Sequence, residues 1–215
     1  IRPLTLEQVA DASIRGQYSG YREEPGVSPG SNTATFGAVR LEVDNWRWQG
    51  VPFYLRSGKA MSCRTTQIVI GFRQPPLELF ACDNSQAQRE ANRLVIQIQP
   101  AEGIQLHFHT KVPGDGMRLR LTDLEFSYSR EFSGRLPEAY EPLLLDCMTG
   151  DASLFARSDE VEKSWGIIDP FVRAWSSDTT PTISIYQPGD WGPAASNAWM
   201  HEQGQSWFDL CPVLK

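Results

Sequence analysis

The stretch "TATFGAVRLEVDNWRWQGVPFYLRS", residues 33–57, contains two runs of aliphatic, aromatic and β-branched residues on either side of a polar turn. In the first run, apolar residues alternate at Phe36 and Ala38 and then shift one step out of phase from Val39 onward. Alternation with a period of two predicts a strand, and the shift predicts a β-bulge near Gly37. The second run, "VPFYLRS", predicts another strand.

The chain downstream continues this pattern and then changes to helical spacing. Four more apolar runs are typical of strands: "TQIVIGFR", "RLVIQIQ", "GIQLHFHT" and "MRLRLTDLEFSYS". After them, "PEAYEPLLLDCM" and "SDEVEKSWGIIDPFVRAW" predict helices, "ISIY" predicts a short strand, and "PAASNAWMHEQG" predicts a last helix. Strands first and helices afterwards predict an α+β fold with a large, mainly antiparallel β-sheet and helices packed on one face.

Two helical details and the N-terminal region complete the predicted organisation. Pro170 is predicted to kink or divide its helix, and Trp165 and Trp175 on the apolar stripe of that helix are predicted to pack in the core. The first residues predict a short helix around Leu4–Ile14, followed by a long loop in "GQYSGYREEPGVSPGS". We therefore divide the chain into an N-terminal helix and loop connection, residues 1–32, and a domain, residues 33–215.

The composition is that of a globular protein and argues against a nucleic-acid-binding or membrane-spanning one. Hydrophobic residues make up 40% of the 215 residues and charged residues 21%, as in an ordinary globular protein. A net charge of -6 with no basic stripe argues against binding to nucleic acid, and no apolar run reaches the roughly 20 residues that a membrane span needs. Cys63, Cys82, Cys147 and Cys211 are scattered without a CxxC pair, which predicts reduced thiols, a cytoplasmic location and no zinc site.

The segment "LRSGKAMSCRTTQIVI", residues 55–70, places two cations, Lys59 and Arg64, five residues apart. In a straight strand or helix these side chains diverge. If the strands before and after "GKAMSCR" pair as a hairpin, with Gly58 permitting the bend, both cations reach one rim and suit a sugar phosphate. Taken alone, the spacing favours the alternative, two ordinary surface charges on a loop.

Other candidate groups indicate ordinary strand surfaces. His107 and His109 share one strand face but lack a third metal ligand, so no metal site is predicted. Asp123 and Glu125 have the same spacing and are interpreted as a solvated face rather than an acid/base pair. The sequence contains no GxGxxG or GxxxxGK[ST] motif, and it predicts no nucleotide-phosphate loop.

With these residues in view, the chain resembles the C-terminal domain of the glucose-6-phosphate dehydrogenase family. The matching segments follow one another over nearly the whole sequence: "RGQYSGY", "TATFGAVRLEVDNWRWQGVPFYLRSGKAM", "LVIQIQPAEGI", "LPEAYEPLLLDCMTGDASLFARSDEVEKSW" and "YQPGDWGP". The resemblance implies oxidation of the C1 hydroxyl of glucose 6-phosphate with NADP as hydride acceptor, giving 6-phosphoglucono-lactone, the first step of the pentose phosphate pathway. It also implies a homodimer or tetramer formed through the sheet.

The resemblance assigns substrate-binding roles but no catalytic residue. Lys59 matches the family's phosphate-binding Lys in "GKA", Arg64 matches a second cation, and Gln99 in "IQP" matches an amide that can bond a sugar hydroxyl. The family's coenzyme motif and catalytic His lie upstream of the position that matches Ile1. We therefore expect a fragment of a longer enzyme that is inactive alone and whose NADP is held mainly by the missing N-terminal domain.

Some family members hold a second, structural NADP on this domain through several Lys and Arg residues. The matching positions here carry uncharged residues or histidine: Thr65, Val69, Gln97, Gln105 and His107. Arg56 alone remains as a cofactor-binding candidate, so a structural NADP site is not expected. The alternative to the enzyme is a stand-alone, non-catalytic module for sugar-phosphate binding or scaffolding.

Overall fold

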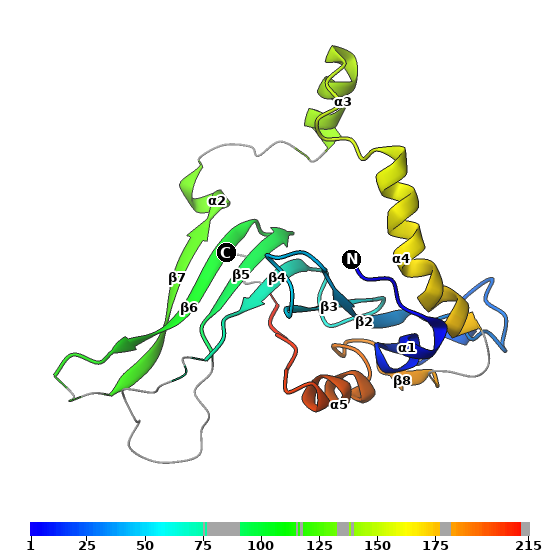
Figure 1. Ribbon diagram of the computed structural model, residues 1–215, viewed down its shortest axis with the longest axis horizontal. Helices are drawn as coiled ribbons and strands as arrows, with labels where there is room; N and C mark the ends of the chain where they lie inside the picture. The colour runs from blue at the N-terminus through cyan, green and yellow to red at the C-terminus, as the bar shows by residue number, and fades with distance from the viewer. Residues whose placement is uncertain are drawn as a thin grey trace. The chain divides into compact units, whose positions relative to one another are not determined.

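The computed structural model describes residues 1–74, 76, 91–114, 116, 118–132, 138, 140–176 and 182–211 (Figure 1). Within these ranges the strands form two four-stranded sheets, with orders β3-β2-β1-β8 and β4-β5-β6-β7. Every strand pairing there is antiparallel except that of β1 with β8. The α+β class with mainly antiparallel pairing is therefore confirmed, and the strands are divided between two sheets.

The chain also separates into two compact units, which are Ile1–Cys63 with Pro142–Asp209, and Arg64–Glu141 with Leu210–Lys215. The first unit contains the strands β1 Ser13–Tyr18, β2 Phe36–Glu42, β3 Pro52–Gly58 and β8 Ser184–Tyr186. Its helices are α1 Leu6–Asp11, the 3₁₀ turn Tyr21–Glu23, α4 Ser158–Ser176, α5 Ala194–Glu202 and, from Pro142 onward, α3 Tyr140–Thr149. The second unit contains β4 Thr66–Gly71, β5 Arg93–Gln99, β6 Gly103–Lys111, β7 Leu119–Ser127 and α2 Tyr128–Glu131.

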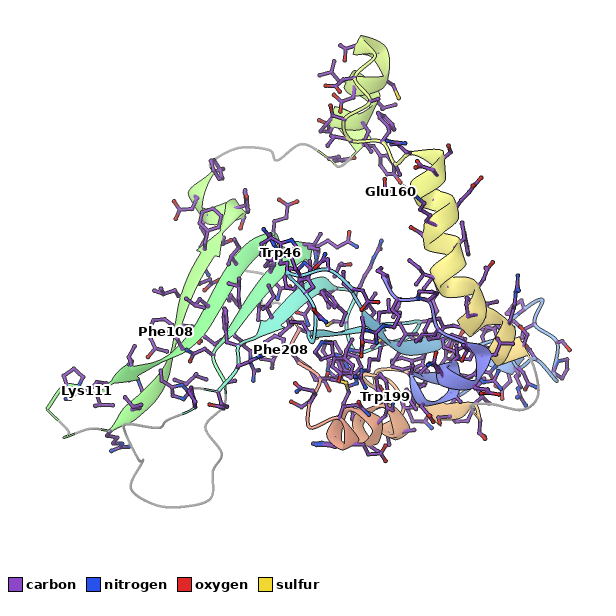
Figure 2. All side chains as sticks on the ribbon, in the orientation of Figure 1. Trp46, Phe108, Lys111, Glu160, Trp199 and Phe208 are labelled. Carbon is purple, nitrogen blue, oxygen red and sulfur yellow. The ribbon has the colours of Figure 1, made fainter. Side chains whose placement is uncertain are left out.

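Helices cover both faces of the first sheet, and this explains the phase of the apolar residues in β2. Phe36 and Ala38 point to one face, where they form a core cluster with residues of α5; Figure 2 shows Trp199 where α5 meets the strands. Leu41 points to the other face and clusters with residues of α1 and α4. Because β2 pairs residue by residue with both neighbours, the predicted bulge near Gly37 is wrong. The phase changes because each face has its own core.

The central strand β1 was not expected, because its composition is typical of a loop. Gly16 lies in the strand where a Cβ would stand 3.0 Å from the Ser184 carbonyl oxygen and 3.1 Å from Cγ of Pro193. Close approach of the neighbouring strand, not chain reversal, therefore requires glycine here. The predicted loop begins only after Tyr18.

The pairing of residues across the second sheet gives it one apolar face. Two cross-strand rows consist entirely of apolar residues: Ile68–Ile96–Ile104–Phe126 and Ile70–Leu94–Leu106–Leu124. Several of these side chains are exposed, Leu124 to 60%. Such a face is typical of a sheet that packs against another surface.

Helix α4 continues through Pro170 without being divided. Its buried residues are Phe171 and Ala174, whereas Trp165 is 61% exposed, so the predicted core position of Trp165 is wrong. Trp175 is half-buried, contacts the Phe171 ring and donates to the Ser13 hydroxyl, as core packing predicts. Ala139, also expected in a helix, lies outside the described residues.

Cys63 and Cys211 are disulfide-bonded, so the expectation of reduced thiols is wrong for these two residues. Cys147 is free and exposed, and Cys82 lies outside the described residues. The absence of a CxxC pair from a sequence therefore does not exclude disulfide bonds. No helix within the described ranges is long and apolar enough to cross a lipid bilayer.

Candidate functional site

The loop of residues 59–63, called here the Lys59 loop, begins where three distant segments meet around Phe36. The Phe36 ring is almost fully buried and makes an edge-to-face contact with Tyr186 at 5.8 Å between ring centroids. A Cβ at Gly58 would lie 2.9 Å from this ring, and a Cβ at Gly192 would lie 2.4 Å from it. Glycine at both positions therefore lets the "GKA" and "DWG" segments pack on the same aromatic ring.

Both backbone groups of Lys59 are fixed by hydrogen bonds. Its N–H donates to the Thr35 carbonyl at 2.8 Å, and its carbonyl accepts from the Tyr186 hydroxyl at 2.7 Å. Burial raises the pKa of Tyr186 above its ordinary value, which keeps this hydroxyl protonated and able to donate. The position of Lys59 is thus set by the ends of two strands, β2 and β8.

The rest of the loop is held by the turn of residues 187–190. The Asp190 N–H donates to the Gln187 carbonyl at 3.0 Å, Pro188 is the second residue of this turn, and Gly189 has a φ of 95°, as a type II turn requires. The turn then bonds the loop twice, from Gly189 N–H to the Ala60 carbonyl at 2.8 Å and from Ser62 N–H to the Asp190 carbonyl at 3.0 Å. Two segments far apart in sequence therefore form one rigid edge.

The Lys59 side chain is exposed, and within the described part of the chain it has no hydrogen bond or ion pair. A compact ammonium on a fixed backbone is suited to binding an anionic oxygen such as that of phosphate. The side chain is flexible, but its attachment point is not. This arrangement can position an anion relative to the first sheet.

Arg56, the cofactor-binding candidate, is engaged by other residues of the first unit. Its guanidinium carbon lies 5.1 Å from the Trp191 ring centroid and 4.6 Å from that of Trp207. One guanidinium nitrogen donates to Asp209 at 2.6 Å and to the Phe208 carbonyl at 3.3 Å, and another donates to the Trp191 carbonyl at 3.4 Å. The Arg56 side chain is 11% exposed. The charge and several donors of Arg56 are therefore already engaged within the first unit.

The predicted hairpin that joins Lys59 to Arg64 is wrong. β3 pairs with β2 in the first sheet, and β4 pairs with β5 in the second. The hydrogen bond from Lys59 N–H to Thr35 continues the pairing of β2 with β3 and keeps this part of the loop in the first unit. The boundary between the units falls between Cys63 and Arg64. A shared rim for the two cations stays a prediction.

Arg64 and Gln99 belong to the second unit, near one end of the pair β4–β5. Thr65, next to Arg64, donates its hydroxyl to the Gln99 carbonyl at 3.2 Å, and the Gln99 side-chain N–H donates to the Thr66 hydroxyl at 3.0 Å. Arg64 and Gln99 are both exposed. The structure therefore brings these two predicted substrate residues to the same strand end.

The carboxylates of Asp123 and Glu125 lie on the sheet surface, as predicted, whereas the His107 side chain is only 14% exposed. His107 Nδ1 lies 2.6 Å from the Asp123 carboxylate, Glu125 pairs with Arg130 at 3.4 Å, and His109 contacts Asn92. Among the described residues, no group of three or more His, Cys, Asp or Glu side chains lies close enough to hold a metal ion.

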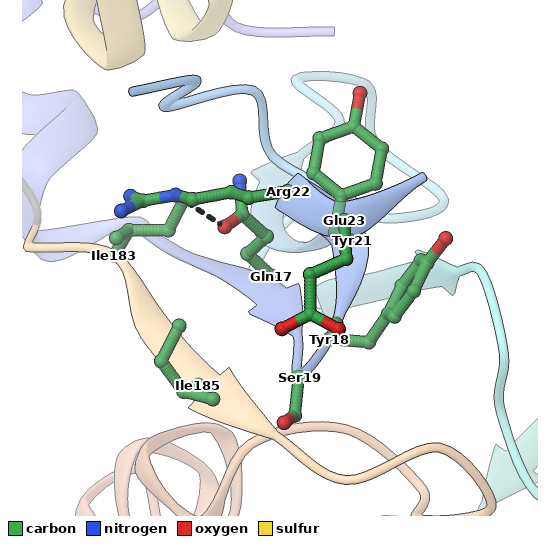
Figure 3. A pocket seen from close by; sticks show the side chains of 9 residues that line it. Gln17, Tyr18, Ser19, Tyr21, Arg22, Glu23, Ile183 and Ile185 are labelled. Atoms are coloured by element: carbon green, nitrogen blue, oxygen red, sulfur yellow. Dashed lines mark hydrogen bonds between the residues drawn. The ribbon is translucent and has the colours of Figure 1, made fainter. Parts of the chain in front are cut away.

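A separate cavity of about 440 Å³ opens beside β1 and β8 (Figure 3). Arg22 lines this cavity and donates to the Gln17 side-chain oxygen at 3.2 Å. The lining residues are Gln17, Tyr18, Ser19, Gly20, Tyr21, Arg22, Glu23, Ile183 and Ile185. Lys59 is not among them, so this cavity is distinct from the Lys59 loop.

The residues that hold the Lys59 loop were not predicted from the sequence. Thr35, Tyr186, Gly189 and Asp190 carry its backbone hydrogen bonds, and Tyr186 lies 127 residues from Lys59. The segments that contain them, "TATF" and "YQPGDWGP", are prominent in the sequence, but no pattern within a segment reports a contact at that separation.

Comparison with known proteins identifies the family. The family model described as "Glucose-6-phosphate dehydrogenase, C-terminal domain" matches residues 1–208. Glucose-6-phosphate 1-dehydrogenase of Treponema pallidum is 42% identical over all of this chain and 43% of its own length. The enzyme of Rhizobium meliloti is 43% identical over 97% of this chain and 44% of its own length. The chain thus spans less than half the length of these curated relatives.

Comparison with solved structures leads to the same enzyme family. A glucose-6-phosphate 1-dehydrogenase from Mycobacterium avium aligns with a TM-score of 0.77 and 35% identity, over 100% of this chain and 42% of that one. A glucose-6-phosphate dehydrogenase in complex with its substrate glucose-6-phosphate aligns with a TM-score of 0.80 and 30% identity, over 97% of this chain and 43% of that one. The sequence and the fold therefore give one answer: the chain belongs to the glucose-6-phosphate dehydrogenase C-terminal domain family.

Proposed function

We propose that this chain is the substrate-side and oligomerisation domain, residues 33–215 with the connection 1–32, of a glucose-6-phosphate dehydrogenase. The whole enzyme would oxidise glucose 6-phosphate to 6-phosphoglucono-lactone with NADP as hydride acceptor, in the cytoplasm. The observation that carries the proposal is the Lys59 loop, whose backbone is fixed on both sides while its ammonium stays exposed. A related structure that contains glucose-6-phosphate as substrate supports the choice of sugar.

In this reaction a general base removes the C1 hydroxyl proton as hydride leaves for the nicotinamide. The proposed role of the chain is to bind and orient the substrate. Lys59 neutralises the phosphate, Arg64 offers a planar fork of donors, and the Gln99 amide bonds a sugar hydroxyl. The base and most contacts to NADP would come from the part of the enzyme that precedes this chain.

A second NADP on this domain does not fit the residues present. Arg56 is engaged by Asp209 and two indole rings. The other matching positions carry Thr65, Val69, Gln97, Gln105 and His107, none of which offers a permanent positive charge to a pyrophosphate. We therefore assign no structural NADP to the chain.

The substitution Lys59→Ala in the full-length enzyme tests the substrate role. We expect the KM for glucose 6-phosphate to rise by roughly one to two orders of magnitude, because a hydrogen bond to a charged group contributes about 1.5–3 kcal/mol. Lys111→Ala is the matched control, since Lys111 is an exposed lysine at the end of β6. Steady-state kinetics in which the two variants have the same KM would remove Lys59 from the site.

The competing function is a non-catalytic module that binds a sugar phosphate or acts as a scaffold. The discriminating measurement is NADPH absorbance at saturating glucose 6-phosphate with the full-length protein, together with calorimetric titration of the sugar phosphate. Binding without any NADPH formation would favour the module. Turnover dependent on both substrates would favour the enzyme.

We also propose that the second sheet forms the interface of a homodimer or tetramer, because apolar side chains across its four strands are exposed. Leu124 and Glu125 are adjacent in β7 and therefore point to opposite faces of this sheet. We expect Leu124→Lys to lower the molar mass of the full-length enzyme in sedimentation equilibrium, whereas Glu125→Lys on the opposite face is the control and should leave it unchanged. Unchanged mass for Leu124→Lys would contradict an interface on the apolar face of this sheet.

A further inference from the structure

We infer that the cluster of Arg56, Trp191, Trp207 and Asp209, called here the Arg56 cluster, positions the Lys59 loop for substrate binding. This inference rests on the proposed function. It assigns to four residues, none of them proposed to touch the substrate, a share in setting where the Lys59 ammonium stands, in addition to the backbone hydrogen bonds of Lys59 with Thr35 and Tyr186. Arg56 thereby becomes a positioning residue rather than a ligand for a nucleotide.

The cluster gathers two indole rings and a carboxylate around one largely buried cation. The Arg56 guanidinium carbon lies over both indole rings, 5.1 Å from the centroid of the Trp191 ring and 4.6 Å from that of the Trp207 ring. Planar guanidinium groups stack on aromatic faces, whereas a lysine ammonium cannot stack in this way. Asp209 supplies the counter-charge at 2.6 Å, with the Arg56 side chain only 11% and the Asp209 side chain 31% exposed.

Each aromatic ring belongs to a different part of the first unit. Trp207 follows α5 and is tied to that helix by a hydrogen bond from its indole N–H to the buried Ser196 hydroxyl at 2.9 Å. Trp191 directly follows the 187–190 turn that bonds the Lys59 loop. Arg56 lies in β3, three residues before Lys59. The cluster therefore joins the C-terminal segment, the turn and the strand that leads into the loop.

The route from the cluster to Lys59 is short and consists of fixed contacts. Trp191 lies between Asp190, whose carbonyl accepts from Ser62, and Gly192, which packs on Phe36. If the guanidinium no longer holds Trp191, the turn keeps its internal hydrogen bond but loses the contact that fixes it against β3. The hydrogen bonds from the turn to Ala60 and Ser62 would then move the loop with it.

Arg40 offers a matched control in the neighbouring strand. It also ties the chain around α5 to the first sheet, because its guanidinium donates to the Gln203 side chain at 2.9 Å and to Glu42 at 3.1 Å. No hydrogen bond or ring contact joins Arg40 to Trp191 or to the Lys59 loop in the part of the chain that the structure describes. Arg40→Lys therefore shows how far the KM changes when arginine hydrogen bonds elsewhere in the first unit are weakened and the 187–190 turn is not disturbed.

The test compares Arg56→Lys, Asp209→Asn and Arg40→Lys in the full-length enzyme, each alone and in the Lys59→Ala background. We expect Arg56→Lys and Asp209→Asn to raise the KM for glucose 6-phosphate by about five- to tenfold, since a displacement of about 1 Å can cost up to a hundredfold. The KM for NADP should change by less than about twofold, because the coenzyme is proposed to bind elsewhere. Arg40→Lys should leave both KM values unchanged.

The Lys59→Ala background shows whether the effect passes through Lys59. Groups that act through one another are not additive, so we expect Arg56→Lys to add less than about twofold once Lys59 is absent. Thermal midpoints reveal whether a variant acts on stability alone. Asp209→Asn, which keeps the shape of the side chain, preserves the test if Arg56→Lys does not fold.

The outcomes separate the inference from the proposed function. An unchanged KM for glucose 6-phosphate in Arg56→Lys and Asp209→Asn, with lower thermal midpoints, would make the cluster purely structural and overturn the inference. The same conclusion follows if the effect of Arg56→Lys is fully retained in the Lys59→Ala background. If Lys59→Ala itself leaves the KM unchanged, the proposed function of the loop fails first.

Discussion

The two sheets of this chain are built from similar strands but buried very differently. In the first sheet, β2 has a core cluster on each face, with α5 on one side and α1 and α4 on the other. In the second, two complete rows of apolar residues cross four strands, yet Leu124 is 60% and Ile68 49% exposed. The first sheet thus carries the rigid frame of the Lys59 loop. The second has an apolar face suited to packing against another surface.

The largest loss of stability is expected for Gly192→Ala, because Gly192 packs directly against the buried Phe36 ring of the first sheet. A Cβ there would stand 2.4 Å from the Phe36 ring, and the φ of 111° is one that side chains other than glycine rarely adopt. Overpacking and the backbone conformation together should cost more than about 3 kcal/mol of unfolding free energy. Chemical denaturation measures this loss.

Gly189→Ala is the control for that substitution. Gly189 also has a positive φ, 95°, but beyond its two chain neighbours nothing lies within 4 Å of its Cβ position. We therefore expect only the backbone cost of about 1–2 kcal/mol. Equal losses for the two variants would show that the Phe36 contact contributes nothing.

A matched leucine pair tests the difference between the sheets directly. Leu41 in the first sheet is 6% exposed, and Leu41→Ala should cost about 2–5 kcal/mol of stability. Leu124→Ala in the isolated chain should cost less than about 0.5 kcal/mol, because an exposed side chain leaves no cavity. A similar loss at both positions would mean that the apolar face of the second sheet is already covered.

A smaller effect is expected for Tyr186→Phe, which removes the hydroxyl that bonds Lys59. The loss should be about 1–3 kcal/mol, because buried oxygen atoms lose their donor. Burial raises the pKa of Tyr186 above its ordinary value of 10.0. The contribution of the protonated Tyr186 hydroxyl to the free energy of unfolding is therefore full below pH 10.0, and it is lost as the pH rises through the raised pKa.

The pH dependence gives this prediction its own check. Stability measured from neutral pH to above pH 10 should fall less steeply in Tyr186→Phe than in the parent chain. Part of the alkaline loss should remain, because burial also raises the pKa of Tyr18 and Tyr54. If the stability of the two proteins falls with pH along parallel curves, the Tyr186 hydroxyl makes no contribution to the alkaline loss of stability.

Much of the fold follows from patterns within one segment. The run Arg93–Gln99 was predicted as a strand with the bounds that the structure shows, because its aliphatic residues end abruptly at both sides. The strand β1 was missed because Gly16 has a packing role that composition cannot distinguish from a turn. Sequence proximity also suggested that β3 pairs with β4, whereas backbone hydrogen bonds assign them to different sheets.

The candidate site was predictable only in part, because local sequence patterns do not show which distant segments contact each other. Lys59 stands out in a short motif, and its family resemblance suggests a role. Its supports are distant in sequence: Thr35 and Tyr186 fix its backbone, and Trp191 and Asp209 hold Arg56. Contacts at such separations depend on how the strands and helices pack, which local periodicity does not encode.

The central claim is that the fixed loop presents Lys59 to the phosphate of the sugar. The most direct measurement is kcat/KM for glucose 6-phosphate relative to that for glucose, in the full-length enzyme and in Lys59→Ala. The account predicts that this ratio falls at least about tenfold in the variant, while kcat/KM for glucose stays unchanged, since only the phosphate contact is lost. An equal change for both sugars, or no change for either, would contradict it.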